Sequence, residues 1–249
     1  MLFLSLGLMA TDANHGFPGS AYNWHQDCAL CRGCIVGLCL ALAGCRSAPA
    51  LQEPLNLSQA KEAVSRYCDS GDYARDISSV AMQALAWVEE RAAKRKNGEH
   101  LAIVLDLDET VLSNEPLIRR LDYAFIPAEW DAWLKKAELP AIEPIRAVYR
   151  RARELGIDVL FVTGRREAGY RACTEENLRR AGMGDYARLL MGTDKGPQRS
   201  NAETKTAQRA ALEKEGFVIV ANVGDQESDL AGGHAERSFK VPDPFYFMP

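Results

Sequence analysis

Closely spaced aspartates occur at two places in the chain, each time directly after an aliphatic run. Asp106 and Asp108 follow the run LAIVL, and Asp225 and Asp229 follow the run FVIVANVG. Carboxylate oxygens are the ligands that Mg²⁺ prefers in proteins, and a carboxylate can also act as a nucleophile or transfer a proton. The two aspartate pairs therefore indicate carboxylate and divalent-metal chemistry, provided that the fold brings them together.

A threonine and a lysine complete the set of groups that could act on a small anion. Thr163 follows the aliphatic run DVLFV, and Lys205 lies in a predicted helix before the last such run. By residue type alone, Lys195 and Lys214 are alternatives to Lys205. A hydroxyl can donate a hydrogen bond and an ammonium group is a compact point charge, so both groups suit the oxygens of an anionic substrate.

The candidate groups stand at the ends of predicted strands. Four continuous aliphatic runs cover 101–107, 158–164, 187–192 and 217–225, and helical patterns lie between them at 142–156, 166–182 and 200–216. Such runs are typical of strands that are buried on both faces of a parallel sheet. The alternation predicts an α/β fold with a doubly wound, mostly parallel sheet. Ligands of such folds bind beyond the carboxyl ends of the strands, which is where the aspartates lie.

The predicted helices carry ordinary start and stop signals. The three helices between the strands each end at a glycine, and Ser200 with Glu203 predicts a capping box. Two further helices are expected before the sheet, at 57–70 with a start at Ser58, and at 74–97. The second has apolar residues at helical spacing at Val80, Ala84, Val88 and Ala92.

An insertion lies between the first two predicted strands. Thr163 follows Asp106 by 57 residues, whereas a strand, a crossover helix and a second strand need roughly 30. We expect the surplus, about 114–140, to form a small helical cap beside the site. It contains four aromatic residues, Tyr123, Phe125, Trp130 and Trp133. They could stack on an aryl group or nucleobase of a ligand or form the core of the cap itself.

The chain begins with a segment that we expect to lie outside the fold. Residues 34–44 read CIVGLCLALAG, follow Arg32 and are too few to span a bilayer. The junction LAGC resembles the lipobox of bacterial lipoprotein signals, in which cleavage precedes an acylated cysteine, here Cys45. We therefore expect a signal region at 1–45, with the true start near Leu30, a tether at 46–56 and the folded domain at 57–249.

The remaining cysteines allow two alternatives. The run CALCRGC contains overlapping C-x-x-C pairs at Cys28, Cys31 and Cys34, as in zinc or iron–sulfur sites. Because the third cysteine already enters the apolar run, we do not expect a closed site there. After cleavage, Cys68 and Cys173 would remain beside Cys45, and whether they form a disulfide is left open.

Composition narrows the class of protein. The chain has 249 residues, of which 47% are hydrophobic and 26% are charged, and a net charge of −4. These values exclude the disordered, collagen-like and multi-span membrane classes. The net negative charge also argues against nucleic acid as a partner, because a protein that binds nucleic acid needs a basic stripe. Arg165 and Arg166 are expected to pair with surface carboxylates. His100 and His234 have no partners at metal-ligand spacing and are expected to be bystanders.

Four of these motifs occur together in the order seen in one superfamily. The sequence DLDET after the first strand, Thr163 after the second, a lysine, and a Gly-Asp with a second aspartate after the fourth resemble haloacid-dehalogenase-type (HAD) phosphatases. Within that superfamily, DLDETVLSN, FVTGR, GDQESDL and the tail RSFKVPDPFYFMP resemble the acid phosphatase branch. That branch includes bacterial lipoprotein acid phosphatases and plant vegetative storage proteins, and the resemblance covers roughly residues 55–249.

The resemblance implies a role for each catalytic candidate. Asp106 is expected to be the nucleophile that forms an aspartyl-phosphate, which divides one difficult displacement into two easier steps. Asp108 is expected to protonate the leaving alkoxide and then to activate water. Thr163 would donate a hydrogen bond to the phosphoryl group. Lys205 is preferred over the other lysines because K-x3-R, with Arg209, matches the pattern of the family.

The resemblance also implies a magnesium site. Asp106 and Asp225 are expected to bind Mg²⁺ through their side chains, and Asp108 through its main-chain carbonyl. Asp229, four residues after Asp225, would lie on the same face if a helix starts there, and would hold the ion directly or through water. A hard cation is needed because a carboxylate that approaches a phosphate dianion is otherwise repelled.

The sequence thus predicts a Mg²⁺-dependent acid phosphatase that hydrolyses small phosphomonoesters, with nucleotides among the candidate substrates. It would be an exported lipoprotein, anchored by lipid on Cys45. Its expected location is the outer membrane, on the side that faces the periplasm. The alternatives are a non-catalytic storage or binding relative of the same fold, and a phosphotransferase or 5′-nucleotidase on the same scaffold. The sequence leaves the oligomeric state, the pH optimum and the physiological substrate open.

Overall fold

The computed structural model describes residues 54–193 and 200–248. Within them the elements in chain order are α1 (Leu57–Asp69), α2 (Asp72–Ala93), β1 (His100–Leu105), α3 (Glu115–Arg120), α4 (Pro127–Lys136), α5 (Glu143–Glu154), β2 (Asp158–Arg166), α6 (Glu167–Arg180), β3 (Arg188–Gly192), α7 (Asn201–Lys214), β4 (Phe217–Gly224), α8 (Glu227–Leu230) and β5 (Arg237–Lys240). Cys45, its lipobox, the CALCRGC cysteines and Lys195 lie outside the described residues.

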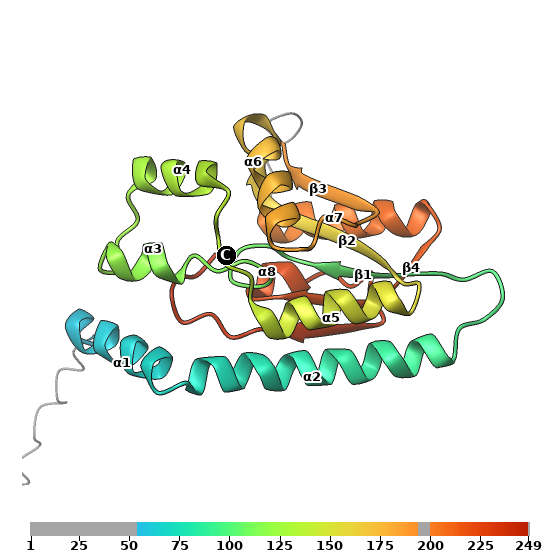
Figure 1. The fold of residues 1–249 in the computed structure, drawn as a ribbon, viewed down its shortest axis with the longest axis horizontal. Helices are drawn as coiled ribbons and strands as arrows, with labels where there is room; N and C mark the ends of the chain where they lie inside the picture. Colours follow the sequence, from blue (N-terminus) through green and yellow to red (C-terminus); the bar gives the residue numbers. More distant parts are fainter. Residues whose placement is uncertain (1–53, 194–199, 249) are drawn as a thin grey trace, which may run out of the picture. The chain divides into compact units, whose positions relative to one another are not determined.

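The strands form one parallel sheet in the order β3-β2-β1-β4-β5 (Figure 1). The predicted α/β fold is therefore confirmed, and the first four strands are the four aliphatic runs. The fifth strand, β5, was not among the predicted strands. Only Phe239 of its four residues is buried, because an edge strand is covered less than a central one and has no continuous aliphatic run.

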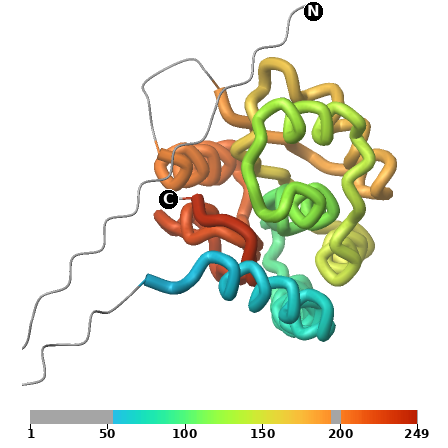
Figure 2. Tube along the Cα trace, turned by 90° about the vertical axis from the view of Figure 1, so that its left-hand side faces the viewer, coloured from blue at the N-terminus to red at the C-terminus, as the bar shows by residue number. Residues whose placement is uncertain are grey.

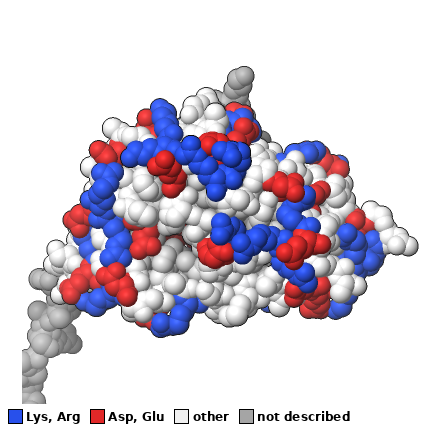
Figure 3. Space-filling model, in the orientation of Figure 1, with Lys and Arg blue, Asp and Glu red and all other residues white. Residues whose placement is uncertain are grey.

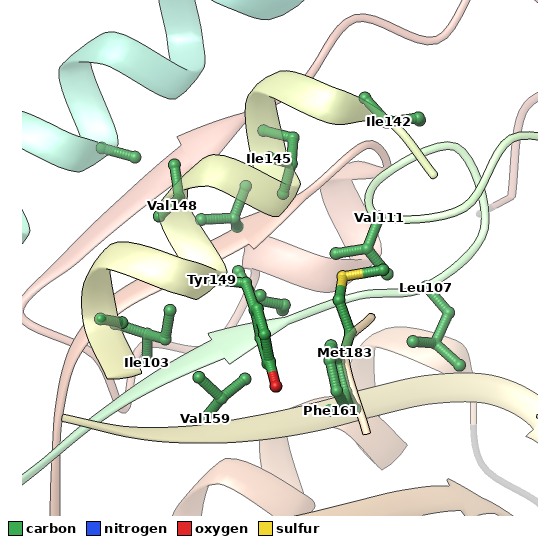
Figure 4. Packing of buried hydrophobic residues seen from close by; sticks show 14 of the residues in the cluster. Ile103, Leu107, Val111, Ile142, Ile145, Val148, Tyr149, Val159, Phe161 and Met183 are labelled. Atoms are coloured by element: carbon green, nitrogen blue, oxygen red, sulfur yellow. The ribbon is translucent and has the colours of Figure 1, made fainter. Parts of the chain in front are cut away.

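Helices cover both faces of the sheet. On one face, Tyr149 of α5 stacks on Phe161 of β2, and Ile145 of α5 belongs to the same buried cluster as Val159 (Figure 4). The same cluster includes Val88 and other residues of α2, and Leu178 at the end of α6. On the other face, Leu212 of α7 packs with Val104, Leu160 and Val162. Burial of these aliphatic side chains from both sides stabilises the central strands, at about 25 cal/mol per Å² of apolar surface.

The two N-terminal helices exist with slightly different ends from those predicted. The side chain of Asn56, rather than of Ser58, caps α1 by accepting from the backbone N–H groups of Ser58 and Gln59. In α2, Ala84 and Val88 are buried as the helical spacing predicted, while Val80 and Ala92 are half-buried. The indole N–H of Trp87 in α2 donates to the backbone of β4 at 2.7 Å.

The signals that end the inner helices are confirmed. Gly156, Gly182 and Gly216 follow α5, α6 and α7, and all three have positive φ, a conformation that glycine adopts without a Cβ penalty. Ser200 and Glu203 form the predicted capping box at the start of α7. The chain can therefore reverse direction within a few residues after each helix and enter the next strand.

The insertion between β1 and α5 contains two short helices, α3 and α4. They lie together at one end of the sheet, with α4 beside α6 (Figures 1 and 2). The hydroxyl of Tyr170 in α6 donates to Asp131 in α4 at 3.0 Å. The loop between α3 and α4 contacts α1, where Ser65 and Tyr123 share a hydrogen bond of 2.7 Å and Lys61 pairs with Asp122 at 2.6 Å. The insertion is thus held from two sides.

The surface carries both charge signs. Basic and acidic side chains intermingle on the face shown in Figure 3, and many are paired, as Arg151 is with Glu89. Every helix in the described part of the chain is too short or too polar to cross a bilayer. The two cysteines in that part, Cys68 and Cys173, are free thiols.

Candidate active site

The carboxyl ends of β1, β2 and β4 bring the predicted site residues to one edge of the sheet. Leu105 of β1 is in register with Val223 of β4, and the backbone N–H of Asp106 donates to the Val223 carbonyl at 3.0 Å. Asp225 directly follows β4, and Thr163 lies near the end of β2. Because neighbouring parallel strands end at the same edge, residues far apart along the chain face one cavity.

Three aspartates form a buried acidic cluster at this edge. Carboxylate oxygens of Asp106, Asp225 and Asp229 all lie within 4.8 Å of one another. Asp229 reaches the cluster from α8, which starts at Glu227, so Asp225 precedes the helix and the two do not share a helical face as predicted. A tight turn joins them instead: a Cβ added at Gly224 would lie 2.4 Å from the Cβ of Asp229, so this turn requires glycine.

Of the three candidate lysines, Lys205 lies at the acidic cluster. Its Nζ donates to Asp106 Oδ1 at 2.6 Å and to Asp229 Oδ1 at 2.5 Å. Its side chain is only 9% exposed. Lys214, by contrast, is exposed in the last turn of α7. The ammonium group of Lys205 thus joins the nucleophile candidate of β1 to an aspartate of α8.

The acidic cluster holds more negative charge than its surroundings compensate. Burial raises the pKa of Asp106 well above its usual value, although the charge of Lys205 opposes the rise. Burial, together with the charge of Asp229, raises the pKa of Asp225 to about 8. Removing carboxylates from water is costly unless cations compensate them. Three convergent oxygen donors and this excess of negative charge fit a hard divalent cation.

Asp108 is held by a different partner, Arg165. The guanidinium of Arg165 binds the Asp108 carboxylate through two bonds, from Nε at 2.9 Å and from Nη2 at 2.6 Å. Burial disfavours the charge on Asp108, but Arg165 and a hydrogen bond from Asn114 outweigh burial and lower its pKa. The expectation that Arg165 pairs with a surface carboxylate was wrong, because the Arg165 side chain is 3% exposed and faces the cavity.

A cavity of about 520 Å³ opens over these groups. Its polar end is lined by Asp106, Asp108, Thr163, Lys205, Asp225 and Asp229. The apolar part of the lining, here called the apolar wall, includes Ile118, Tyr123, Phe125, Trp130, Phe245, Tyr246 and Met248. Pockets of this size that combine an apolar wall with a few convergent polar groups are typical of small-molecule sites.

The four cap aromatics divide between the two roles left open by the sequence. Tyr123, Phe125 and Trp130 line the cavity, and Phe125 is 71% exposed. Trp133 instead packs against the main core and donates its indole N–H to Asn114 at 3.0 Å. The cap therefore contributes both a wall of the cavity and a structural anchor.

Three residues have supporting roles that the sequence did not assign. The hydroxyl of Thr110 donates to Asp225 Oδ1 at 2.9 Å, and the side chain of Gln226 donates to Asp225 Oδ2 at 2.6 Å. Arg209, one turn after Lys205 in α7, donates to the backbone carbonyls of Asp229, Ala231 and Gly233 and so holds the loop after α8. Thr110 and Gln226 lie inside the motifs, and that position was their only signal, whereas Arg209 had been named only as part of the K-x3-R pattern.

The two predicted bystander histidines lie away from the cavity. His100 pairs with Asp158 at 2.6 Å, at the start of β1 and β2 and thus at the opposite edge of the sheet. His234 pairs with Glu213 at 2.5 Å. Neither is among the residues that line the cavity.

Comparison with known proteins assigns the chain to a family. Residues 40–249 match the family described as HAD superfamily, subfamily IIIB (Acid phosphatase). The stem 28 kDa glycoprotein of Glycine max is 33% identical over 193 residues, which cover 75% of this chain and 74% of that protein. Acid phosphatase 1 of Solanum lycopersicum is 37% identical over 149 residues, 58% of each chain.

The fold agrees with a solved structure. The class C acid phosphatase from Bacillus anthracis superposes with a TM-score of 0.62 at 23% identity, covering 77% of this chain and 86% of that one. This likeness concerns the fold. The match over residues 40–249 shows the family: the chain belongs to the acid phosphatases of HAD subfamily IIIB, a family of phosphomonoester hydrolases.

Proposed function

We propose that this protein hydrolyses phosphate monoesters through an aspartyl-phosphate on Asp106 and requires Mg²⁺. The observation that carries the proposal is the buried convergence of Asp106, Asp225 and Asp229 within 4.8 Å, beside the ammonium group of Lys205. Carboxylates are brought together in this way, against their mutual repulsion, where a cation is to be bound and a phosphate attacked.

The acidic cluster would hold the metal. Asp106, Asp225 and Asp229 supply side-chain oxygens, and Asp108 would add its main-chain carbonyl. Bound there, Mg²⁺ neutralises charge on the phosphoryl oxygens. Thr110 and Gln226 each donate to one oxygen of Asp225 and so fix the plane of its carboxylate. Such supporting bonds orient metal ligands.

Asp106 is the proposed nucleophile, and Asp108 transfers protons. Asp106 attacks phosphorus and the alkoxide leaves, taking a proton from the protonated form of Asp108, which becomes more populated as the pH falls toward the lowered pKa of this group. Asp108 then accepts a proton from the water that hydrolyses the aspartyl-phosphate. The paired bonds from Arg165 keep the Asp108 carboxylate at a fixed place in the cavity. The two carboxylates thus have separate partners and separate roles.

Two further groups bind the phosphoryl group. The Thr163 hydroxyl accepts a hydrogen bond from the backbone N–H of Arg165 at 3.1 Å, which leaves its own proton free to donate to a phosphoryl oxygen. Lys205 supplies a positive charge that reaches the same end of the cavity. Because phosphoryl transfer depends mainly on positioning and charge stabilisation, these two contacts are expected to contribute to the rate.

The apolar wall favours leaving groups with a flat, apolar part. Trp130 lies 5.7 Å from Phe125 and 6.4 Å from Tyr246, measured between ring centroids. An aryl or nucleoside group attached to the phosphate would contact these rings while the phosphate reaches the acidic cluster. We therefore propose aryl phosphates and nucleoside monophosphates as the substrate class.

We also propose that the protein is an exported lipoprotein anchored through Cys45. The support is the sequence alone, namely Arg32, the short apolar run and the junction LAGC. The intact mass of the mature protein from an exporting bacterial host tests this proposal. A diacylated or triacylated chain that starts at Cys45 is the expected result, and a mature chain that starts at an earlier residue would contradict it.

Hydrolysis of 4-nitrophenyl phosphate tests the proposed mechanism. We expect D106N to lose at least about 10³-fold in kcat, because the nucleophile is removed, and EDTA to abolish activity in a way that added Mg²⁺ restores. Asp185, an exposed residue that pairs with Arg153, provides the matched control D185N, which should retain activity. Activity that survives both EDTA and D106N would refute the mechanism. An inactive wild type would favour a storage or binding role.

A further inference from the structure

Glu109 is a fully buried carboxyl group that the proposed mechanism does not use. It lies inside the motif DLDET, directly after Asp108, with none of its surface exposed. Its backbone has a φ of 55°, in the left-handed region that residues other than glycine rarely adopt. Both burial of the carboxyl group and this backbone conformation are costly, so the surrounding contacts must hold the residue in place.

Two residues bind the carboxyl group of Glu109. Its Oε1 accepts the backbone N–H of Asn114 at 2.5 Å. Its Oε2 accepts the side-chain amide of Asn114 at 3.0 Å and the hydroxyl of Tyr246 at 2.6 Å. Glu109 thus connects the loop after β1 with the first residue of the cap and with the tail that follows β5.

Asn114 passes this connection on to Asp108. Its Nδ2 donates one bond to Asp108 Oδ1 at 2.8 Å and another to Glu109, and its Oδ1 accepts the indole N–H of Trp133 at 3.0 Å. With both sides of the amide occupied, the side chain has a single favourable orientation. The oxygen of Asp108 that accepts from Asn114 also accepts from Arg165 Nη2, so the carboxylate is held from two directions.

Tyr246 brings the wall of the cavity into the same network. Its ring lines the cavity and meets Trp130 edge-on, at 79° between the ring planes. Its hydroxyl is bonded to Glu109 behind that wall. The Glu109 network therefore consists of Asp108, Glu109, Asn114, Trp133 and Tyr246, and it joins the proton-transferring group to the surface that a leaving group would contact.

We propose that Glu109 is a positioning residue that fixes Asn114, and through it Asp108, for proton transfer to the leaving group. The inference rests on the proposed function, in which Asp108 is the proton donor. Loss of a Glu109 contact leaves the acidic cluster and Lys205 untouched, because neither makes a hydrogen bond to Glu109. The defect should therefore concern proton donation and spare the attack on phosphorus.

Two substrates that need different amounts of proton donation reveal such a defect. 4-Nitrophenolate leaves readily without a proton, whereas the alkoxide of benzyl phosphate must be protonated as it leaves. Both substrates carry one aromatic ring for the apolar wall. The quantity to compare is kcat/KM, which reports the first chemical step and is independent of the later hydrolysis of the aspartyl-phosphate.

The variants are E109Q and Y246F, with Y67F as the matched control. The hydroxyl of Tyr67 also donates to a carboxylate at 2.6 Å, that of Asp76, but it lies in α1 away from the cavity. For E109Q we expect kcat/KM for benzyl phosphate to fall about tenfold or more, with a change below about threefold for 4-nitrophenyl phosphate. For Y246F we expect kcat/KM for benzyl phosphate to fall about threefold more than kcat/KM for 4-nitrophenyl phosphate. For Y67F we expect no difference between the two substrates.

The outcomes separate this inference from the proposed function. If wild type hydrolyses both substrates and E109Q slows both by the same factor, the positioning role is refuted while the proposed function stands. If wild type hydrolyses neither substrate, both the positioning role and the proposed function are refuted. Thermal unfolding establishes whether each variant is folded. Should E109Q fail to fold, Y246F, which removes a single oxygen atom, decides the question by the same ratio.

Discussion

At the scale of single residues, the pairing of Arg165 with Asp108 distinguishes the two carboxylates of the DLDET motif. Asp106 meets the flexible ammonium of Lys205, whereas Asp108 meets a planar guanidinium through two parallel bonds. A two-point contact fixes the direction of a carboxylate as well as its charge. Two identical side chains, two positions apart, are thereby prepared for different tasks.

This difference predicts that lysine cannot replace Arg165. In R165K the positive charge remains, but only one bond to Asp108 can form, so we expect kcat/KM for benzyl phosphate, whose leaving group needs a proton from Asp108, to fall about tenfold. Steady-state kinetics at saturating Mg²⁺ measures the change. The control is R151K, since Arg151 pairs with Glu89 and Glu154 at the surface. An R165K enzyme as fast as wild type would contradict the argument.

At the scale of elements, one arginine links three segments at the amino-terminal edge of the sheet. Arg91, near the end of α2, donates to Glu99 at 2.6 Å and to Glu236 at 2.9 Å. Glu99 immediately precedes β1, and Glu236 immediately precedes β5. The same guanidinium therefore holds the end of the long helix to the starts of a central and an edge strand.

The Arg91–Glu99 pair predicts a defined dependence of stability on pH. Hydrogen bonds from Arg91 and from the backbone of Lys96 lower the pKa of Glu99 from 4.5 to about 2. Because the folded-state pKa is the lower one, the pair stabilises the fold above about pH 4.5, and this contribution disappears as the pH falls toward 2. Wild type should therefore exceed E99Q in free energy of unfolding at neutral pH.

Urea unfolding between pH 7 and pH 3 measures this difference. We expect the gap between wild type and E99Q to narrow steadily below about pH 4.5. The control is E62Q, because Glu62 forms an exposed pair with Arg66 within α1, and such pairs contribute little. A gap that stays constant over the whole range would show that Glu99 does not act through its charge.

At the scale of the whole molecule, the buried negative charge of the site lowers the free energy of unfolding. Four carboxylates, those of Asp106, Asp108, Asp225 and Asp229, share the polar end of the cavity with the cations of Lys205 and Arg165. Burial of the excess negative charge raises the pKa of Asp106 and Asp225. The two hydrophobic clusters on either face of the sheet must outweigh this cost.

A divalent cation is therefore expected to stabilise the folded protein. A ligand that binds only the folded state adds about 2.7 kcal/mol at a concentration 100 times its Kd, so Mg²⁺ should raise the Tm of wild type and EDTA should reverse the rise. D225N, which lacks one ligand, should lose most of the response, while D185N should keep it. A Tm that does not respond to Mg²⁺ at any concentration would contradict the metal site.

The sequence predicted the parts of this protein whose signals are local. Continuous aliphatic runs identified β1 to β4, because a strand buried on both faces needs apolar side chains at consecutive positions. Glycines marked the ends of the inner helices, and Ser200 with Glu203 marked the start of α7. The edge strand β5 escaped prediction, because Phe239 is its only buried residue. Asn56 rather than Ser58 capped α1, a difference of two positions that periodicity does not resolve.

The arrangement of the site was predictable in outline and only the tertiary structure decided its contacts. The sequence by itself indicated that Asp106, Thr163 and Asp225 follow strands of one parallel sheet, whose carboxyl ends lie at one edge. That these strands are neighbours came from the tertiary structure. The bonds from Arg165 to Asp108 and from Tyr246 to Glu109 cannot be predicted from the residues that surround either partner in the sequence. Such contacts join residues that are far apart along the chain, and they depend on how side chains pack once the sheet and the tail are in place.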